Sequence, residues 1–366
     1  MKIIHCADLH LDSKMNANLD EQRAKIRRGE ILHTYERMVD YAVQNDISVI
    51  LISGDLFDTE NISAVTANVV FHKIQQHPEI NFYYLRGNHD RLNILTDQYG
   101  KPENLKLFSD RWRTYPEAGG RITVSGMELT GNHGKEAAES LNLDRNCFNI
   151  VMLHGQDMDV KSTDRAEVIC LRDYSARGID YLALGHIHTY KRGNLDGRGV
   201  YCYPGCLEGR GFDESGEHGF VLLEIDEETG DMQDRLIPFA QRQLYTIEAD
   251  ITGCGTSAEM KEIIDAMVQS VACSPESLIK VVLKGELDVD SEKNIEYLLA
   301  TLNRNFFCAK IDDETALRLN PEDYLYDRSL KGEFVRQVMA DDSISADEKS
   351  IVIRYGLKAI SGEEVF

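Results

Sequence analysis

Five short apolar segments, each followed at once by polar residues, constrain the fold of this chain more than any other feature. Each is five or six residues long, a length typical of buried strands, and they are KIIHCA (2–7), SVILIS (48–53), NFYYLR (81–86), NIVMLH (149–154) and YLALG (181–185). Apolar residues recur at helical spacing between the early segments, at 31–46 and 64–77. Strands that alternate with helices predict an α/β sheet covered on both faces.

Each predicted strand ends in residues that can bind a metal ion or a phosphate. In chain order, the strand ends carry Asp8 and His10; Gly54, Asp55 and Asp58; Gly87, Asn88, His89 and Asp90; His154 and Gly155; and Gly185, His186 and His188. Ligands collect at the carboxyl ends of the strands in sheets of this kind. Any one of these short motifs, taken alone, is often only a turn. Five in succession are hard to explain by packing.

The types of side chain predict which ions bind. Two aspartates, one asparagine and four histidines give a ligand set without thiolate, and they are Asp8, Asp55, Asn88, His10, His154, His186 and His188. Oxygen and nitrogen ligands of this kind favour manganese, iron or zinc over calcium or a structural zinc. Seven ligands are too many for one ion. They suit two ions that share a bridging carboxylate, as in two-metal phosphoester hydrolases.

Length and composition set wider bounds. A chain of 366 residues with 42% hydrophobic content is expected to form two domains. The eight cysteines include no CxxC pair, which argues against a zinc ribbon or a dense disulfide framework. We see no signal peptide and no apolar run of the roughly 18 residues that a span requires, so a soluble, cytoplasmic protein without a membrane segment is expected. The formal net charge of −22 argues against a generally basic, nucleic-acid-binding surface. Metal ions and a basic partner chain could offset that objection.

The series DxH, GDLFD, GNHD, H and GHIH resembles the calcineurin-like metallophosphoesterase superfamily. The resemblance implies a metallophosphoesterase β-sandwich flanked by helices, in four α/β/β/α layers. It also implies two divalent ions, with Mn²⁺ expected and iron or zinc as alternatives. By the family pattern, the first ion is held by Asp8, His10, Asp55 and His188. The second is held by Asp55, Asn88, His154 and His186, so that Asp55 is the bridge.

The same resemblance gives His89 a catalytic role instead of a ligand role. In the family, the histidine of GNHD lies beside the scissile phosphate and helps to protonate the leaving oxygen. Such an imidazole needs a carboxylate on its other nitrogen, and Asp58 matches the orienting aspartate of the family. Asp90 is expected to brace the loop. A similar block, GNHG at 131–134, lacks the terminal acid and is interpreted as a loop.

Two further stretches resemble the SbcD-type DNA repair nucleases: HCADLHLDS (5–13) and YCYPGCLEGRGFDESGEHGFVLLEID (201–226). This resemblance implies a nuclease domain over 1–242, with exonuclease and endonuclease activity on duplex ends and single strands of DNA. It also implies an SMC-like ATPase partner of SbcC type and a possible homodimer. Cys206 stands where the family more usually has a serine or another small residue, a departure that we expect to leave the metal site untouched.

The remainder of the chain predicts a second module. Strands are expected at 244–250, 277–287 and 306–311, and helices at 257–271, with a cap at Ser257, and at 291–306. The pattern over 243–325 resembles the small α/β cap domain of SbcD-like nucleases, which helps to select duplex ends. Residues 243–366 carry about half of the net negative charge, more than a cap that binds DNA alone would be expected to have.

The C-terminal segment, 326–366, is predicted to form two short helices, at 329–342 and 345–360. The family resemblance implies that this region docks on the coiled coil of the ATPase. The apolar residues that could form the docking faces are Phe334, Val335, Val338, Met339, Ile351, Val352 and Tyr355. The alternative is that they pack against the cap of the same chain.

Three functions from different classes remain open. The first is a metal-dependent DNA nuclease of SbcD type. The second is a phosphoesterase acting on small nucleotides, cyclic nucleotides or phosphoproteins, which the acidity of the chain favours. The third is a structural adaptor for an ATPase with a vestigial site, which is weakened because no ligand of the family pattern is missing.

Overall fold

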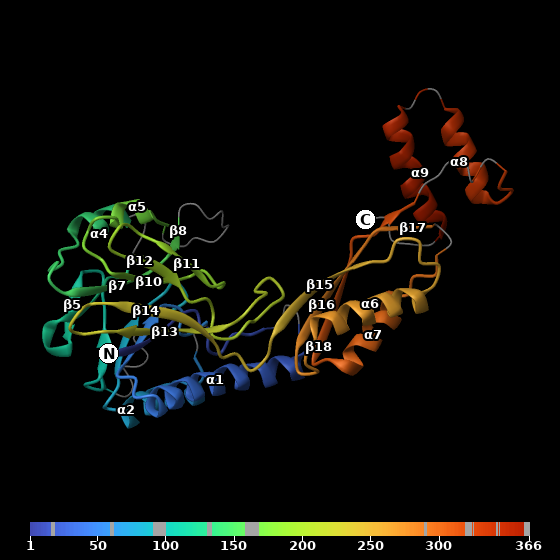
Figure 1. Ribbon diagram of the computed structural model, residues 1–366. Coiled ribbons are helices and arrows are strands. Elements are labelled where there is room, and N and C mark those ends of the chain that lie inside the picture. Colours follow the sequence, from blue (N-terminus) through green and yellow to red (C-terminus); the bar gives the residue numbers. More distant parts are fainter. Residues whose placement is uncertain are drawn as a thin grey trace. The chain divides into compact units, whose positions relative to one another are not determined.

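The computed structural model describes residues 1–15, 19–58, 62–90, 100–129, 134–157, 168–288, 291–318, 324, 326–341, 343 and 345–361. The chain divides into two compact units, Met1–Gln243 and Leu244–Phe366, whose secondary structure is shown in Figure 1. The block GNHG was expected to form a loop, and its residues 131–133 lie outside the described residues.

The first unit contains two six-stranded sheets. In the first sheet the order is β14 (Met232–Pro238), β13 (Gly219–Ile225), β1 (Lys2–Cys6), β2 (Val49–Ser53), β3 (Asn81–Leu85) and β4 (Leu105–Leu107). Strands β1 to β4 are parallel to one another, and β13 and β14 are added antiparallel at the edge next to β1. Three of the five predicted strands, β1, β2 and β3, therefore lie side by side.

The second sheet holds the other two predicted strands. Its order is β11 (Lys191–Asn194), β12 (Val200–Tyr203), β10 (Tyr181–Gly185), β7 (Phe148–His154), β6 (Ile122–Gly126) and β5 (Arg113–Glu117). The four inner strands are parallel, and β5 and β11 are antiparallel at the two edges. The five strands are thus shared between two sheets, which confirms the β-sandwich that the family resemblance implied and corrects the single sheet that the alternation of strands and helices suggested.

The two sheets pack face to face around one apolar core. Ile3, Val49 and Leu51 of the first sheet share a buried cluster with Ile150 and Met152 of the second. The alternate residues of β7, such as Val151 and Leu153, belong to a separate cluster on the outer face. A strand buried on both faces needs no polar alternation, which explains why these segments are continuous apolar runs.

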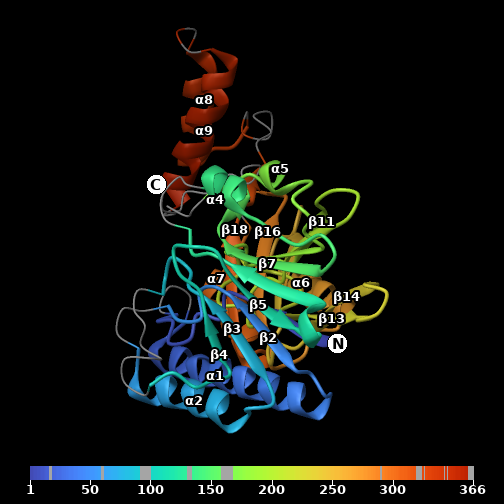
Figure 2. The ribbon, with the colours of Figure 1, turned by 90° about the vertical axis from the view of Figure 1, so that its left-hand side faces the viewer.

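Helices cover the outer faces, which completes the four α/β/β/α layers (Figures 1 and 2). Helices α1 (Glu21–Gln44) and α2 (Ala64–Gln76) lie on the first sheet, and α4 (Gly134–Ser140) and α5 (Leu171–Tyr174) on the second. Short elements complete the unit: η1 (Ala118–Gly120), β8 (Gln156–Asp157) and β9 (Val168–Ile169). The mixed α/β fold matches the expected metallophosphoesterase architecture.

Helix α1 begins ten residues before the predicted start. Its N-cap is Asp20, whose side chain accepts a hydrogen bond from the backbone N–H of Arg23. The added turns are rich in charge and lack apolar spacing, but Arg27 is fully buried and pairs with Glu30 and Glu208. Ion pairs with a distant segment therefore stabilise turns that the hydrophobic pattern does not predict.

The second unit begins with a three-stranded parallel sheet and two helices. The strands are β15 (Leu244–Asp250), β16 (Leu278–Lys284) and β18 (Cys308–Asp313), in that order. Helices α6 (Ser257–Val271) and α7 (Ile295–Asn305) share its apolar core, and β17 (Glu286–Leu287) pairs with β19 (Ala316–Leu317). The N-cap of α6 is Thr256 in a capping box with Glu259, so the predicted cap at Ser257 was wrong by one residue.

Helices α8 (Leu330–Ala340) and α9 (Ala346–Ser361) follow, close to the predicted positions. Val335 and Val338 of α8 pack in one buried cluster with Ile353 and Leu357 of α9. Both valines are therefore buried between the two helices and not on a docking face, and Tyr324 of the predicted cap packs against the cluster. Of the other predicted docking residues, Met339, Ile351, Val352 and Tyr355 are exposed and Phe334 is partly buried against this cluster. Within the described part of the chain, no helix combines the length and apolar character that a bilayer span requires.

Candidate metal centre

The loops after β1 and β2 run side by side and carry the first candidate ligands. The backbone N–H of Asp8 donates to the carbonyl of Gly54 at 3.1 Å, and that of His10 donates to the carbonyl of Asp55 at 2.9 Å. Asp8, His10 and Asp55 have φ values of 53°, 45° and 50°, and His186 after β10 has 102°. Left-handed backbone at non-glycine residues is strained and clusters at functional sites.

Asp90 ties the loop after β3 to the loop after β2. Its buried carboxylate accepts hydrogen bonds from the backbone N–H groups of Phe57 at 2.8 Å and of Leu56 and Gly87 at 3.1 Å each. This is the bracing role that was expected for the last residue of GNHD.

Two glycines permit the close approach of these loops. A Cβ atom on Gly87 would lie 2.1 Å from Oδ1 of Asp55. Gly54 has a φ of 95°, and a Cβ there would lie 2.0 Å from Nδ1 of His154. A side chain at either position would displace a candidate ligand.

Three candidate histidine ligands share one hydrogen-bonding arrangement. Nδ1 of each ring lies beside an acceptor: Ser53 O at 2.9 Å for His154, Asp58 Oδ1 at 3.2 Å for His10 and Glu214 Oε1 at 2.6 Å for His188. A hydrogen on Nδ1 satisfies these acceptors and leaves Nε2 with a lone pair. Metal-binding histidines are held in this way, with an acceptor on the nitrogen that does not face the ion.

The Nε2 atoms converge on one another and on Asp55. Nε2 of His10 and Nε2 of His188 are 3.2 Å apart. Nε2 of His154 lies 3.0 Å from Oδ1 of Asn88 and 3.3 Å from Oδ2 of Asp55, and that same oxygen is 3.8 Å from Nε2 of His10. Atoms with lone pairs face one another here, so each close pair needs a proton or a cation between its members. These nitrogen and oxygen atoms are therefore suitably placed to bind divalent ions.

The ionisation of the site agrees with that fit. Burial lowers the pKa of His154, but the adjacent Asp55 and Asp8 carboxylates and the hydrogen bond to Ser53 O together raise it to about 9. Burial raises the pKa of Asp8 to about 6, and this carboxylate also accepts the backbone N–H of His186 at 3.0 Å. A proton is therefore favoured on His154 where a cation could take its place.

The candidate ligands form two neighbouring groups. Ligand atoms of Asp8, His10 and His188 lie within 4.8 Å of one another, as do those of Asp55, His154 and His186. Asn88 joins the second group through its contact with His154. The structure thus brings all seven predicted ligands into one place, with Oδ2 of Asp55 between the groups. Their assignment to two ions stays a prediction.

His89 and Asp58 form a pair beside the two groups. Nδ1 of His89 lies 3.1 Å from Oδ1 of Asp58, and the backbone N–H of His89 donates to Oδ1 of Asp55 at 2.9 Å. The imidazole remains 41% exposed, unlike the buried ligand His10. The ring is thus oriented on one nitrogen and accessible to solvent, as a proton donor to a substrate must be.

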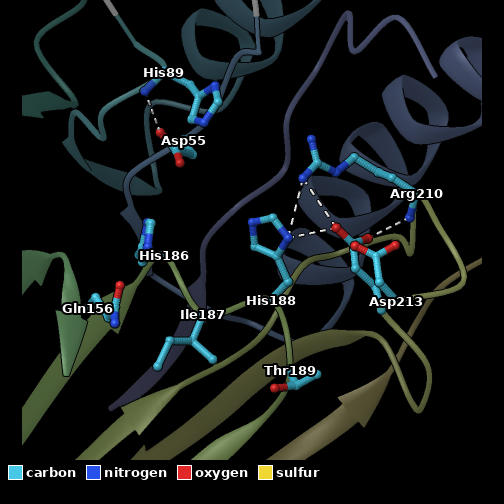
Figure 3. Close-up of a pocket in the computed structure, with 10 residues that line it drawn as sticks. Asp55, His89, Gln156, His186, Ile187, His188, Thr189, Arg210 and Asp213 are labelled. Atoms are coloured by element: carbon cyan, nitrogen blue, oxygen red, sulfur yellow. Dashed lines mark hydrogen bonds and ion pairs between the residues drawn. The ribbon is translucent and has the colours of Figure 1, made fainter. Parts of the chain in front are cut away.

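A pocket of about 450 Å³ opens beside this site (Figure 3). Its lining comprises Asp55, His89, Gln156, His186, Ile187, His188, Thr189, Arg210, Asp213 and Glu214. The sequence analysis did not single out Arg210 or Glu214, although both lie in the block 201–226. The only pattern in the sequence that could have indicated them is the arginine and the acidic residues that follow the YPG block.

The position of Cys206 contradicts the expectation that this residue leaves the candidate metal site untouched. Its buried Sγ lies 3.6 Å from Oε2 of Glu214 and 3.3 Å from Nδ1 of His218. Because Glu214 contacts His188, the unusual cysteine does reach the metal site through one intermediate residue. His218 is held between Cys206 and the backbone carbonyl of Glu214.

The four layers, the ligand types and the paired loops together define a metal-dependent phosphoester hydrolase. Comparison with known families agrees: residues 1–190, more than half of the chain, match the model of the calcineurin-like phosphoesterase family, and the chain belongs to that family.

The chain is also similar to individual proteins. The uncharacterized metallophosphoesterase YhaO of Bacillus subtilis is 30% identical over 238 residues, which cover 62% of this chain and 57% of that protein. The DNA double-strand break repair protein Mre11 of Methanosarcina acetivorans is 23% identical over 370 residues, which cover 95% of this chain and 57% of that protein. Mre11 of Sulfurisphaera tokodaii is 25% identical over 264 residues, which cover 68% of this chain and 66% of that protein. The alignments reach little more than half of the length of the first two relatives.

Proposed function

We propose that this protein is a two-metal phosphodiesterase that cuts DNA in DNA repair, as an exonuclease and endonuclease of SbcD type. The observation that carries the proposal is the convergence of Nε2 of His10 and His154 on Oδ2 of Asp55, with Nε2 of His188 3.2 Å from that of His10, beside an oriented and accessible His89.

The chain's own residues supply binding and proton transfer. Asp8, His10, Asp55 and His188 would hold one ion, and Asp55, Asn88, His154 and His186 the other. Two ions held there would act as Lewis acids on the phosphate oxygens and make water a stronger nucleophile. The hydrogen bond to Asp58 raises the pKa of His89, which favours a protonated ring. With Nδ1–H donated to Asp58, the proton on Nε2 is the one available to the leaving oxygen.

Manganese is the proposed metal. Imidazole and carboxylate ligands without thiolate suit Mn²⁺, and they also accept iron and zinc. Metal analysis of the purified protein, followed by reloading of the chelated protein with each ion separately, tests this choice. Highest activity with zinc or iron would contradict manganese without affecting the two-ion assignment.

The relatives named as double-strand break repair proteins support DNA as the substrate. Their similarity extends over most of the chain, beyond the phosphoesterase family match at 1–190. On this basis residues 1–242 would be the nuclease domain and 243–325 a cap that selects duplex ends. We further propose that the protein acts in the cytoplasm, and that two copies form a dimer on duplex ends.

Hydrolysis of end-labelled linear duplex and single-stranded DNA by the manganese-loaded protein tests the nuclease proposal. Asp55→Ala is the control, because it removes the carboxylate placed between both groups of ligands. We expect metal-dependent cutting that disappears in the variant. Equal cutting by Asp55→Ala would show that the activity comes from another source.

A small substrate is the second candidate. The net charge of −22 disfavours long contacts with a phosphate backbone, and a pocket of about 450 Å³ has the size of a small-molecule site. Nucleotides, cyclic nucleotides or phosphoproteins would then be the substrates. Turnover of bis-para-nitrophenyl phosphate without cutting of either DNA would favour this candidate.

An SMC-like ATPase of SbcC type is the proposed partner, and α8 and α9 are its proposed docking site. Ile351 and Tyr355 of α9 expose 45% and 48% of their surface, although both are apolar or aromatic. We expect Ile351→Asp to weaken binding to a co-purified ATPase, with Gln269→Ala, an exposed position on α6 outside the docking site, as the control. Unchanged binding after deletion of residues 329–361 would contradict the docking site.

A further inference from the structure

Arg210 lies where two carboxylates of the candidate site approach each other. It belongs to the segment between β12 and β13, and its side chain is 19% exposed. Nη1 lies 3.5 Å from Oδ2 of Asp58, and Nη2 lies 3.2 Å from Oε1 of Glu214. Figure 3 shows the guanidinium group beside His188.

Each of these two carboxylates orients histidines of the site. Asp58 uses Oδ1 to contact Nδ1 of His10 at 3.2 Å and of His89 at 3.1 Å, and offers its other oxygen to Arg210. Glu214 contacts Nδ1 of His188 at 2.6 Å. One guanidinium group therefore stands a single residue away from His10 and His89, and its Nη2 also lies 3.3 Å from Nδ1 of His188.

Electrostatics require a cation at this point. Asp58 and Glu214 are 17% and 8% exposed, and carboxylates so far removed from water need compensation. Within the described parts of the chain, no lysine and no second arginine forms an ion pair with either of them. Arginine suits the task because its planar group carries donors at fixed angles.

The same geometry argues against direct contact with substrate. Both terminal nitrogens of Arg210 are engaged by carboxylates, and its Nε is buried without a hydrogen-bond partner. The backbone N–H of Arg210 donates to Oε2 of Glu214 at 2.7 Å, which fixes the residue to the carboxylate that it neutralises.

We propose that Arg210 is a positioning residue: its guanidinium group holds Asp58 and Glu214 as one unit and thereby fixes the rings of His10, His89 and His188. This inference deepens the proposed two-metal function and rests on it. It assigns a role in the site to the GRGFDE stretch that follows the YPG block.

The first test is a double-variant cycle on metal binding. Mn²⁺ affinity is measured by chelator competition for the wild type, Arg210→Met, Glu214→Gln and the double variant. We expect Arg210→Met to weaken binding of one Mn²⁺ by about 10-fold, the lower range for residues that support a ligand. The loss in the double variant should be smaller than the two single losses combined, because only the contact through Asp58 is left for Arg210→Met to remove. Fully additive losses would overturn the proposal.

The second test separates kcat from KM with bis-para-nitrophenyl phosphate. A positioning residue lowers kcat and leaves KM nearly unchanged, and its effect should shrink in an Asp58→Asn background. Added guanidinium ion at millimolar concentration should partly restore Arg210→Ala. A change confined to KM, independent of Asp58, would instead show that Arg210 binds the substrate phosphate.

The controls keep the inference separate from the proposed function. Arg235→Ala removes an exposed ion pair with Glu224 and should change neither metal affinity nor kcat. If Arg210→Met fails to fold, as judged by circular dichroism, Arg210→Lys replaces it. The Mn²⁺ affinity of Arg210→Lys should then lie between those of the wild type and Glu214→Gln. A wild type that binds Mn²⁺ without hydrolysing any phosphodiester would refute the proposed function, and the metal-binding cycle would still decide the role of Arg210.

Discussion

Nδ1 of His89 lies 3.1 Å from Oδ1 of Asp58, and that same oxygen lies 3.2 Å from Nδ1 of His10. One carboxylate oxygen thus serves a candidate proton donor and a candidate metal ligand. Changes at His89 and at Asp58 should therefore have different consequences, although the two residues are in contact.

Replacement of His89 by alanine should remove proton transfer and keep the metal ions. The ring nitrogen lies within 4.8 Å of ligand atoms of His10 and Asp58, but the family pattern assigns it no metal, so metal content should stay near the wild-type value. We expect kcat to fall by about 10²–10⁴-fold, the usual contribution of general acid–base catalysis. Metal analysis and hydrolysis of bis-para-nitrophenyl phosphate check both points. Equal metal loss in His89→Ala and Asp55→Ala would contradict the division of roles.

Replacement of Asp58 by asparagine should affect catalysis and metal binding together. The amide keeps the volume of the carboxylate but has no charge to stabilise the protonated form of His89 or to orient His10. We expect kcat to fall and Mn²⁺ affinity to weaken by about 10-fold, as for other residues that support a ligand. Chelator competition measures the affinity. Wild-type affinity in Asp58→Asn would show that the contact with His10 does not help to hold metal.

Replacement of Gly87 by alanine should disrupt the site through one methyl group. Its Cβ would lie 2.1 Å from Oδ1 of Asp55, so the loop or the carboxylate must move. The control is Gly197→Ala, because a Cβ at that glycine meets nothing within 4 Å. We expect metal content and kcat to fall sharply in the first variant and to stay unchanged in the second. Full activity of Gly87→Ala would show that the loop is less constrained than the contact distance implies.

The individual strands could be predicted because each corresponds to a local pattern in the sequence. Strands β2 and β10 are buried along their whole length, and such strands are continuous apolar runs. The ligands were predictable because they follow those runs directly. The division of five strands between two sheets followed only from the family resemblance, since a strand that packs on a second sheet has the same composition as one that packs on helices.

Arg210 and Glu214 could not be predicted for a second reason. They follow no predicted strand, and their role depends on Asp58 and His188, which lie elsewhere in the chain. The first turns of α1 were missed for a related reason, because Arg27 pairs with Glu208 across 181 positions of sequence. The cap of α6 could have been read correctly, since Thr256 and Glu259 have the spacing of a capping box.

The buried ion pairs of Glu30 with Arg27 and Arg242 predict a pH-dependent contribution to stability. Glu30 receives hydrogen bonds from Arg27 at 2.8 Å and from Arg242 at 2.6 Å. Burial of Glu30 raises its pKa, but the hydrogen bonds from Arg242 and Arg27 together outweigh that effect, so its pKa is lowered. A lowered pKa in the folded state means that the contribution is complete above the unfolded pKa, about 4.3 for glutamate. It is lost as pH falls through the folded pKa.

Glu30→Gln should therefore reduce the free energy of unfolding at pH 7 by about 3 kcal/mol, the lower end for breaking a buried pair. The difference from wild type should shrink below about pH 4, because wild-type Glu30 then becomes protonated and loses the same interaction. Urea denaturation at a series of pH values measures this difference. A difference that stays constant from pH 7 to pH 3 would show that glutamine disturbs packing and that the charge of Glu30 contributes little.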